Sequence, residues 1–121
     1  MANHNDLGKA GEIIAADHLG LNGYEIIEKN WRFGKAEIDI IAKKEALLIF
    51  IEVKTRSTDF FGKPEEFVSQ KKMEMVADAA NIFIEKMAFD GEIRFDVIGI
   101  VLKKDNSFTL QHFEDTYFPE W

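Results

Sequence analysis

The stretch LLIFIEVKTR, residues 47–56, most strongly limits what this chain can fold into. Its five consecutive apolar residues predict a strand that is buried on both faces, and such strands lie at the centre of a sheet. The apolar run continues into Glu52, Val53 and Lys54 without a turn residue. Because residues two apart share one face of a strand, Glu52 and Lys54 point the same way. A central strand is therefore expected to carry two opposite charges on one face.

The periodicity of the remaining chain predicts a mixed α/β fold. Helices are predicted at 6–21 and 69–87, strands at 24–33, 36–43, 46–54, 92–102 and 107–113, and a loop at 55–64. Asp6 is predicted to cap the first helix, and Gly23 to end it. This order predicts one domain, residues 1–121, with a mixed sheet that has a helix against each face. We expect residues 114–121 to form a surface tail.

Acidic residues on the two central strands favour a metal site. Glu37 and Asp39 share a face of their strand, and a hairpin in register would bring Asp39 near Glu52. Carboxylates held this close repel each other, and a divalent cation removes the conflict because Mg²⁺ prefers carboxylate oxygens as ligands. The alternative is that Glu52 and Lys54 form an exposed ion pair at a strand end. Asp96 and Arg94 are most simply an internal ion pair or a strand-end contact.

Glu12 is a third candidate for the acidic cluster. Its neighbours on the helix surface are Gly8, Ala15, Ala16 and Leu19, which form a face of mostly small residues that can pack closely on a sheet. A carboxylate on this face would extend the acidic cluster. The alternative is that Glu12 faces solvent, as most helical glutamates do.

The start of the second helix carries Gln70, Lys71 and Lys72. Lysines in a first turn oppose the helix dipole, whereas a nearby phosphate would make both the dipole and the lysines favourable. Gln70 falls on the same helical face as Met73, so we expect it to point inward towards the sheet. The alternative is an exposed first turn that solvent screens.

Charge is distributed unevenly along the 121 residues. The net charge of −7 argues against a general nucleic-acid binder, yet residues 29–72 hold 10 Lys and Arg against 7 Asp and Glu. The predicted phosphate contacts are Arg32, Lys35, Arg56, Lys63, Lys71 and Lys72. The simpler alternative is that these basic residues are scattered by chance in an acidic protein. The chain has no cysteine and no apolar stretch near the length of a membrane helix, so we expect a cytoplasmic protein without a membrane partner.

Together these residues resemble a known nuclease superfamily. Asp39 followed by Glu52-Val53-Lys54 is similar to the PD-(D/E)xK signature of restriction-endonuclease-like proteins. The blocks GKAGEIIAADHL, NGYEIIEKNWR, AEIDIIA, FIEVKTR, FGKPEEFVSQKK and RFDVIGI resemble the YraN-like family of bacterial proteins in order and spacing. Archaeal Holliday-junction resolvases are similar more distantly. The chain departs from the pattern at Ala36, where the family usually has glycine, and at Ile38, which replaces the proline of the signature.

The resemblance implies an αβββαβ nuclease core with a site for Mg²⁺ or Mn²⁺. It implies Asp39 and Glu52 as metal ligands, with Glu12 and Val53 as further metal-site residues. Lys54 corresponds to the catalytic lysine, and Gln70 to a polar position at the start of the second helix. Glu12 and Gln70 are thus predicted members of the catalytic set.

The predicted function is nucleic-acid binding, most simply of DNA, with a Mg²⁺-dependent endonuclease-like site that hydrolyses phosphodiester bonds, as in DNA repair or recombination. A non-catalytic nucleic-acid-binding or assembly module with the nuclease fold is the alternative. A scaffold whose acidic cluster is structural is a third. The sequence leaves open whether the protein is an enzyme and whether it forms a homodimer.

Overall fold

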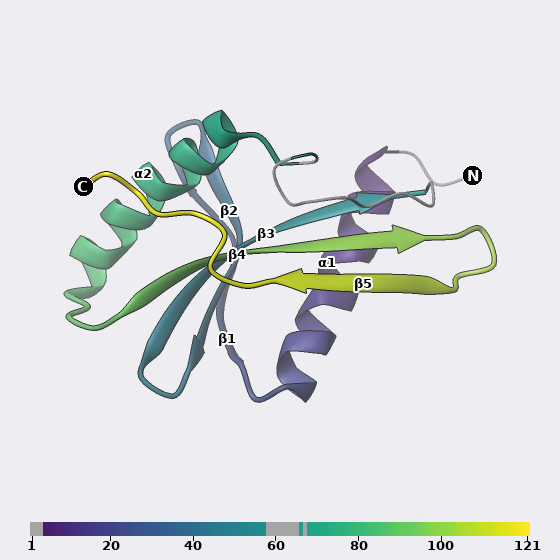
Figure 1. Cartoon of the computed structure of the whole chain (residues 1–121), viewed down its shortest axis with the longest axis horizontal. Helices are drawn as coiled ribbons and strands as arrows, with labels where there is room; N and C mark the ends of the chain where they lie inside the picture. The colour runs from purple at the N-terminus through teal and green to yellow at the C-terminus, as the bar shows by residue number, and fades with distance from the viewer. Residues whose placement is uncertain (1–3, 58–65, 67) are drawn as a thin grey trace.

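A five-stranded sheet with two long helices organises the chain (Figure 1). The computed structural model describes residues 4–57, 66 and 68–121. In chain order the elements are α1 (His4–Leu21), β1 (Glu25–Phe33), β2 (Ala36–Lys44), β3 (Leu47–Arg56), α2 (Gln70–Met87), β4 (Ile93–Leu102) and β5 (Phe108–Phe113).

The sheet is mixed, and its strands lie in the order β1-β2-β3-β4-β5. Strands β3 and β4 are parallel, because α2 connects them, and the other neighbours are antiparallel. The stretch predicted to be central, β3, is the middle strand. The mixed α/β architecture is therefore confirmed, and it is consistent with a restriction-endonuclease-like fold.

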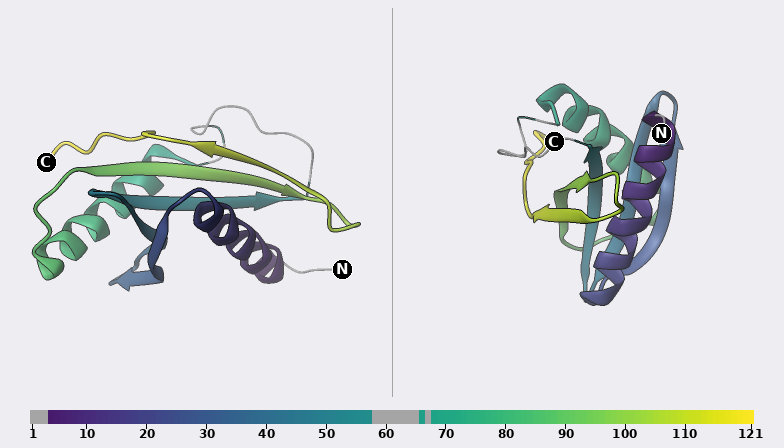
Figure 2. Two further views of the ribbon diagram at one scale, coloured as in Figure 1. Left: turned by 90° about the horizontal axis from the view of Figure 1, so that it is seen from below. Right: turned by 90° about the vertical axis from the view of Figure 1, so that its right-hand side faces the viewer.

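One helix covers each face of the sheet (Figure 2), and each face carries its own apolar core. On β3, Leu48 and Phe50 pack with the α2 cluster, whereas Ile49 and Ile51 pack with the α1 cluster. This alternation is what the period of a strand requires when both faces are covered. The helices thus lie on opposite faces, as the sequence predicts.

Two predicted boundaries differ from the structure by two residues, and the others agree to within one. The first helix begins at His4, so Asp6 lies inside its first turn instead of capping it. Strand β3 continues to Arg56, although the sequence predicts a loop from residue 55. It continues because β4 is long enough to pair with Thr55 and Arg56. Residues 58–64 of the predicted loop, which include Lys63, lie outside the described residues.

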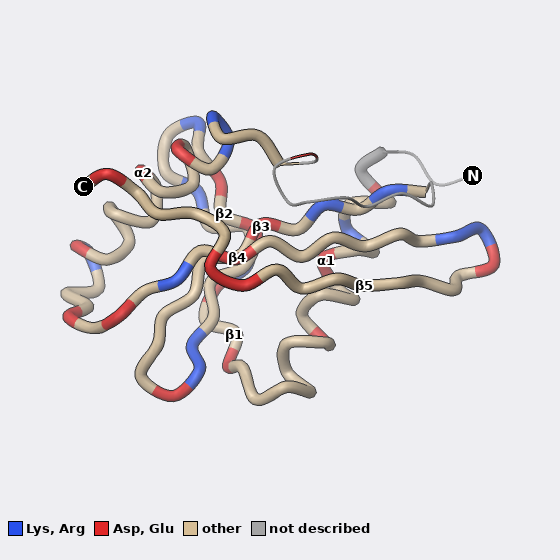
Figure 3. Tube along the Cα trace, viewed as in Figure 1, with Lys and Arg blue, Asp and Glu red and all other residues tan. Residues whose placement is uncertain are grey.

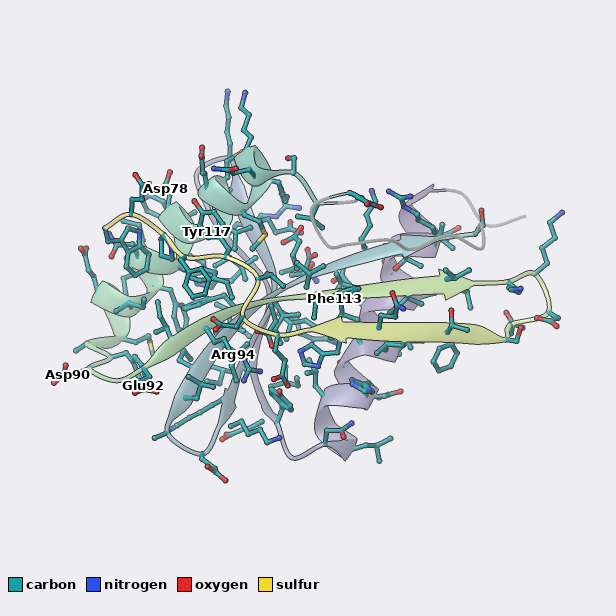
Figure 4. The ribbon with its side chains drawn as sticks, in the orientation of Figure 1. Asp78, Asp90, Glu92, Arg94, Phe113 and Tyr117 are labelled. Carbon is teal, nitrogen blue, oxygen red and sulfur yellow. The ribbon has the colours of Figure 1, made fainter. Side chains whose placement is uncertain are left out.

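Residues 114–121 follow β5 across the end of the sheet and run beside α2 (Figure 1). The backbone N–H of Thr116 donates to the carbonyl of Phe95 at 2.7 Å. The rings of Tyr117 and Trp121 meet the ring of Phe95 at centroid distances of 5.9 and 6.2 Å. Figure 4 shows Tyr117 over this segment beside α2. The tail therefore packs Tyr117 and Trp121 on Phe95 of β4.

Among the described residues, neither helix combines the length and apolarity that crossing a bilayer requires.

Candidate functional site

The site begins where β2 bends away from β3. Their pairing starts at Ile40 and Ile51 and does not include Asp39. Ile38 packs in the α2 cluster, whereas Ile40, two residues on, packs in the α1 cluster. On the neighbouring strand, Asn30 has a left-handed backbone (φ 54°). The alternation of β2 thus breaks at Asp39, and a hollow opens between the strands.

In this gap the side chain of Asp39 replaces a backbone carbonyl as a hydrogen-bond acceptor. Its Oδ2 accepts a hydrogen bond of 2.8 Å from the N–H of Val53 on β3. A carboxylate thereby satisfies the donor that the diverging strand leaves without a carbonyl partner. This bond fixes Asp39 against the residue that follows Glu52.

Glu52 and Asp39 are buried together, each with 7% of its surface exposed. Burial, followed by the charge of Asp39, raises the pKa of Glu52 to about 9, and the Lys72 ammonium opposes this shift. Burial also raises the pKa of Asp39, against the hydrogen bond from Val53. Glu52 Oε2 is buried and has no hydrogen-bond partner among the described residues. The pair is therefore short of positive charge and of donors.

Gly11 brings helix α1 to this site. A Cβ built on Gly11 would lie 1.7 Å from Thr55 Oγ1, so only glycine permits this approach of α1 to β3. Glu12 follows in the helix and is half-buried. Burial and the charge of Asp39 raise the pKa of Glu12, while a hydrogen bond with Asn30 opposes the shift. Glu12 is thus part of the same electrostatic cluster.

Lys72 supplies positive charge from the start of α2. Its Nζ lies 3.5 Å from Glu52 Oε1, and 42% of its side chain is exposed. Lys54, two residues after Glu52, is half-buried. These residues line one hollow of about 840 Å³ between the N-terminal parts of the two helices, which we call the acidic hollow. Its lining includes Glu12, Asn30, Asp39, Glu52, Val53, Lys54, Thr55 and Lys72.

Gln70 does not join this group. It is exposed, and it lines two other hollows, with Met73 and Phe118 among their residues. The expected inward direction of Gln70 is therefore wrong, because the backbone of α2 turns that position toward the C-terminal tail. Its predicted catalytic role stays a prediction.

The predicted phosphate contacts are dispersed around the acidic hollow. Arg32 lines it and pairs with Glu37 at 2.7 Å, with 75% of the arginine side chain exposed. Lys35 and Lys71 are exposed, and Arg56 is half-buried at the end of β3. Figure 3 shows basic segments at the start of α2 and near the far end of β3. The structure thus places positive charge on both sides of the hollow.

Sequence reasoning missed three features of the site. Thr55 Oγ1 is buried against Gly11 and has no hydrogen-bond partner among the described residues. Asn30 interacts with Glu12, and Lys72 pairs with Glu52 as well as being a candidate phosphate contact. The glycine before Glu12 was the available signal for the close approach at Thr55. No sequence signal marked the other two, because they depend on how separate elements pack.

The chemistry of the acidic hollow fits a divalent cation. Two buried carboxyl groups, an orphaned carboxylate oxygen and three raised pKa values are the environment that a cation with oxygen ligands relieves. Within the described part of the chain, no three acidic, histidine or cysteine side chains form a ready-made metal cage. A cation here would take Asp39 and Glu52 and complete its shell with water, as Mg²⁺ commonly does.

Fold and site together describe a mixed α/β protein, consistent with a restriction-endonuclease-like fold, that has a pair of buried carboxyl groups at the bend of its sheet. Residues 11–100 match the uncharacterised protein family UPF0102. The chain belongs to this family, which is the YraN-like family that the sequence motifs indicate.

Relatives from several bacteria align along nearly the whole chain. The UPF0102 protein FP2501 of Flavobacterium psychrophilum is 48% identical over 118 residues, and the match covers 98% of both chains. The UPF0102 proteins of Christiangramia forsetii and Phocaeicola vulgatus are 47% and 42% identical, again over 98% of both chains. These relatives share the family and the length of this protein.

One solved structure is similar at a low level. It is Pyrococcus furiosus SfsA in complex with Ca²⁺, with a TM-score of 0.36 and 17% sequence identity. The match covers 89% of this chain and 62% of that one, so this protein spans less than two thirds of SfsA. A likeness this weak carries no argument about the site.

Proposed function

We propose that this protein binds nucleic acid and hydrolyses its phosphodiester bonds at the acidic hollow, as a Mg²⁺- or Mn²⁺-dependent endonuclease. The observation that carries the proposal is the pair Asp39 and Glu52, buried together with one carboxylate oxygen left without a partner. A purely structural pair would have its oxygens satisfied by the chain. DNA in the cytoplasm is the proposed substrate, and the homodimer stays a prediction.

Asp39 and Glu52 would hold the cation, with Glu12 on the adjacent helix and Val53 beside them as the further predicted metal-site residues. A bound Mg²⁺ would lower the pKa of a coordinated water and offset charge on a phosphoryl oxygen. Asp39 is already oriented for this role by its hydrogen bond with the Val53 N–H. That bond engages the Oδ2 atom of Asp39.

Lys54 is the proposed catalytic cation of the chain itself. It follows Glu52 by two residues on β3, so both side chains leave the strand on the same face. It lines the acidic hollow, where an ammonium can donate a hydrogen bond to a phosphate oxygen as negative charge develops there. Glu12, with its raised pKa, is suited to hold a proton near the reacting groups.

Positive residues around the hollow support a nucleic-acid substrate despite the net charge of −7. Lys71 and Lys35 are exposed, and phosphate contacts of this kind dominate affinity for nucleic acid. We therefore expect binding that weakens as salt rises, with a modest slope because few cations surround the site.

A substrate panel tests the proposal. Branched, nicked and single-stranded DNA should be incubated with Mg²⁺ or Mn²⁺ and the wild-type protein, and at least one substrate should be cleaved. Lys54→Ala should lose about a hundredfold or more in cleavage rate while keeping most of its binding, because it removes one phosphate contact among several. Lys35→Ala with Lys71→Ala is the matched variant, because it removes two exposed phosphate contacts and should weaken binding, while cleavage recovers at saturating protein concentration.

The outcomes separate the two classes of function. Binding that depends on salt, without cleavage of any substrate under either metal, would establish the non-catalytic nucleic-acid-binding module. A protein that neither binds nor cleaves would show that the basic residues around the hollow are scatter on an acidic surface.

A further inference from the structure

Lys72 occupies an unusual position for a lysine. It is the third residue of α2, and its backbone N–H donates to the Ser69 hydroxyl that caps the helix, at 3.1 Å. A helix N-terminus disfavours positive charge unless an anion lies nearby. Here the acidic partner is Glu52, whose Oε1 lies 3.5 Å from the ammonium. The chain thus uses a lysine where its own helix would favour a neutral or acidic residue.

The contact between Lys72 and Glu52 is incomplete. The ammonium reaches one carboxylate oxygen, and Glu52 Oε2 has no hydrogen-bond partner among the described residues. The glutamate side chain is 9% exposed, whereas the lysine side chain is 42% exposed, so the lysine enters the hollow from solvent. Ion pairs with one exposed, flexible partner are weak and easily exchanged. Lys72 therefore neutralises the site in part and can leave it.

We propose that Lys72 is a resident counter-ion of the acidic hollow, which a divalent cation displaces and which then binds a phosphate of the nucleic acid. This inference rests on the proposed function, and it adds a coupling between the two ligands. A divalent cation carries twice the charge of the ammonium and can contact both Asp39 and Glu52. It therefore outcompetes the lysine for Glu52.

Displacement leaves Lys72 beside a helix start that favours an anion. The released ammonium and the first turn of α2 together attract phosphate more strongly than either does while Lys72 is paired with Glu52. Metal and nucleic acid then increase each other's affinity by the same factor, because coupling between two bound ligands is reciprocal. Lys72 is thus a positioning residue that links the two sites.

Lys71 is the natural control. It precedes Lys72 in the same turn and carries the same charge, but it is exposed and does not line the hollow. If the lysines acted only through overall charge, substituting either one would change the Mn²⁺ affinity equally. If Lys72 competes with the cation for the hollow, only the substitution of Lys72 changes that affinity.

The first test measures Mn²⁺ affinity by titration calorimetry without nucleic acid. Lys72→Met should bind Mn²⁺ about tenfold more tightly than wild type, because a positive charge close to the cation is removed. Lys71→Met should stay within about twofold, because its charge is exposed and screened by salt. Equal affinities of wild type and Lys72→Met, or equal tightening in both variants, would overturn the inference. Circular dichroism melts confirm that each variant is folded, and Lys72→Gln repeats the test if Lys72→Met is not.

The second test measures the coupling with a phosphorothioate DNA duplex as the probe. Mn²⁺ should raise the affinity of wild type for the duplex, and this gain should be about fivefold smaller in Lys72→Met. An unchanged gain would show that Lys72 does not link the ligands.

A different set of results would overturn the proposed function itself. Wild-type protein that binds no Mn²⁺, or an Asp39→Asn variant that binds it equally well, would place no cation in the hollow and would overturn both proposals. Wild-type binding that Asp39→Asn abolishes, with no effect of Lys72→Met, would overturn only the role of Lys72.

Discussion

Two buried acidic sites lie at adjacent positions of the sheet and have opposite electrostatics. Asp96 on β4 pairs in register with Ile51, the residue before Glu52 on β3. Asp96 accepts bonds of 2.8 Å from Arg94 Nε and Nη2 and of 3.0 Å from the Asp115 N–H, and it contacts His112 Nε2 at 2.7 Å. Arg94 also reaches toward the segment after β5 (Figure 4). Every oxygen of Asp96 thus has two partners.

The pKa values follow from this difference. Burial would raise the pKa of Asp96, but the hydrogen bonds with His112, Arg94 and the Asp115 N–H outweigh burial and lower it. At Glu52 burial and the charge of Asp39 prevail, and the pKa rises. A carboxylate that serves the fold is completed by the chain, whereas the acidic hollow is left incomplete, as a site for a ligand requires.

Disrupting the complete site, which is Asp96 with its hydrogen-bond partners, should have the largest effect on stability. Asp96→Asn should lower the free energy of unfolding by about 3 kcal/mol, because it leaves Arg94 without its anion and turns an amide NH₂ toward other donors. Urea denaturation followed by circular dichroism measures this change. Asp39→Asn is the matched substitution, and it should cost far less because an amide oxygen can still accept from the Val53 N–H. Equal losses would erase the distinction between the two sites.

A divalent cation should strengthen only the incomplete site. Mn²⁺ at about a hundred times its dissociation constant should stabilise the folded wild type by about 2.7 kcal/mol, measured as a shift in thermal melting. Asp39→Asn should lose most of this gain. Asp90→Asn removes an exposed carboxylate in the α2–β4 connection and should keep the gain. Equal gains in all three proteins would place the cation elsewhere on the acidic surface.

Acid should erase the advantage of the complete site. The pKa of Asp96 is lowered in the folded protein, so its stabilising contribution is fully present above its ordinary value of 3.8. That contribution is lost as the pH falls through the lowered folded value. The difference in unfolding free energy between wild type and Asp96→Asn should therefore be constant from neutral pH to about pH 5 and shrink in stronger acid. A difference that grows in acid would contradict the assigned sign.

The smallest effect on stability is expected from a substitution of Glu52 in the incomplete site, the acidic hollow. Glu52→Gln should change the free energy of unfolding by less than about 1 kcal/mol in the absence of metal, because the raised pKa of Glu52 already favours the neutral carboxyl group and the substitution removes only a weak contact with Lys72. The same variant should lose its response to Mn²⁺. A large loss of stability in metal-free urea denaturation would show that Glu52 serves the fold.

Much of the fold could be predicted from local patterns. The alternation along residues 36–43 and the apolar run at 47–51 predict the hairpin and the central strand, and helical spacing predicts α2. The prediction failed at Thr55 and Arg56, because a strand continues wherever its neighbour continues, and that depends on the length of β4. The N-terminus of α1 was misplaced for a related reason, since Asp6 is compatible both with a cap and with a first turn.

The candidate site was predicted in part. Strand periodicity and the family resemblance select Asp39, Glu52 and Lys54, and the structure brings them together with Glu12 in one hollow. Their roles stay predictions. Gln70 was misjudged because its direction depends on how α2 is rotated against the tail, which helical spacing alone does not specify.

The sequence by itself determined the types and order of the elements, the apolar faces, and the family, because these follow from residue period and motif. Only the tertiary structure decided that β2 bends at Asp39, that Lys72 reaches Glu52, and that Asp96 is satisfied while Glu52 is not. The physical reason is that a buried charge is stabilised or left unpaired by groups from distant parts of the chain. Arg94, His112 and Asp115 surround one carboxylate, and no comparable set completes the other among the described residues.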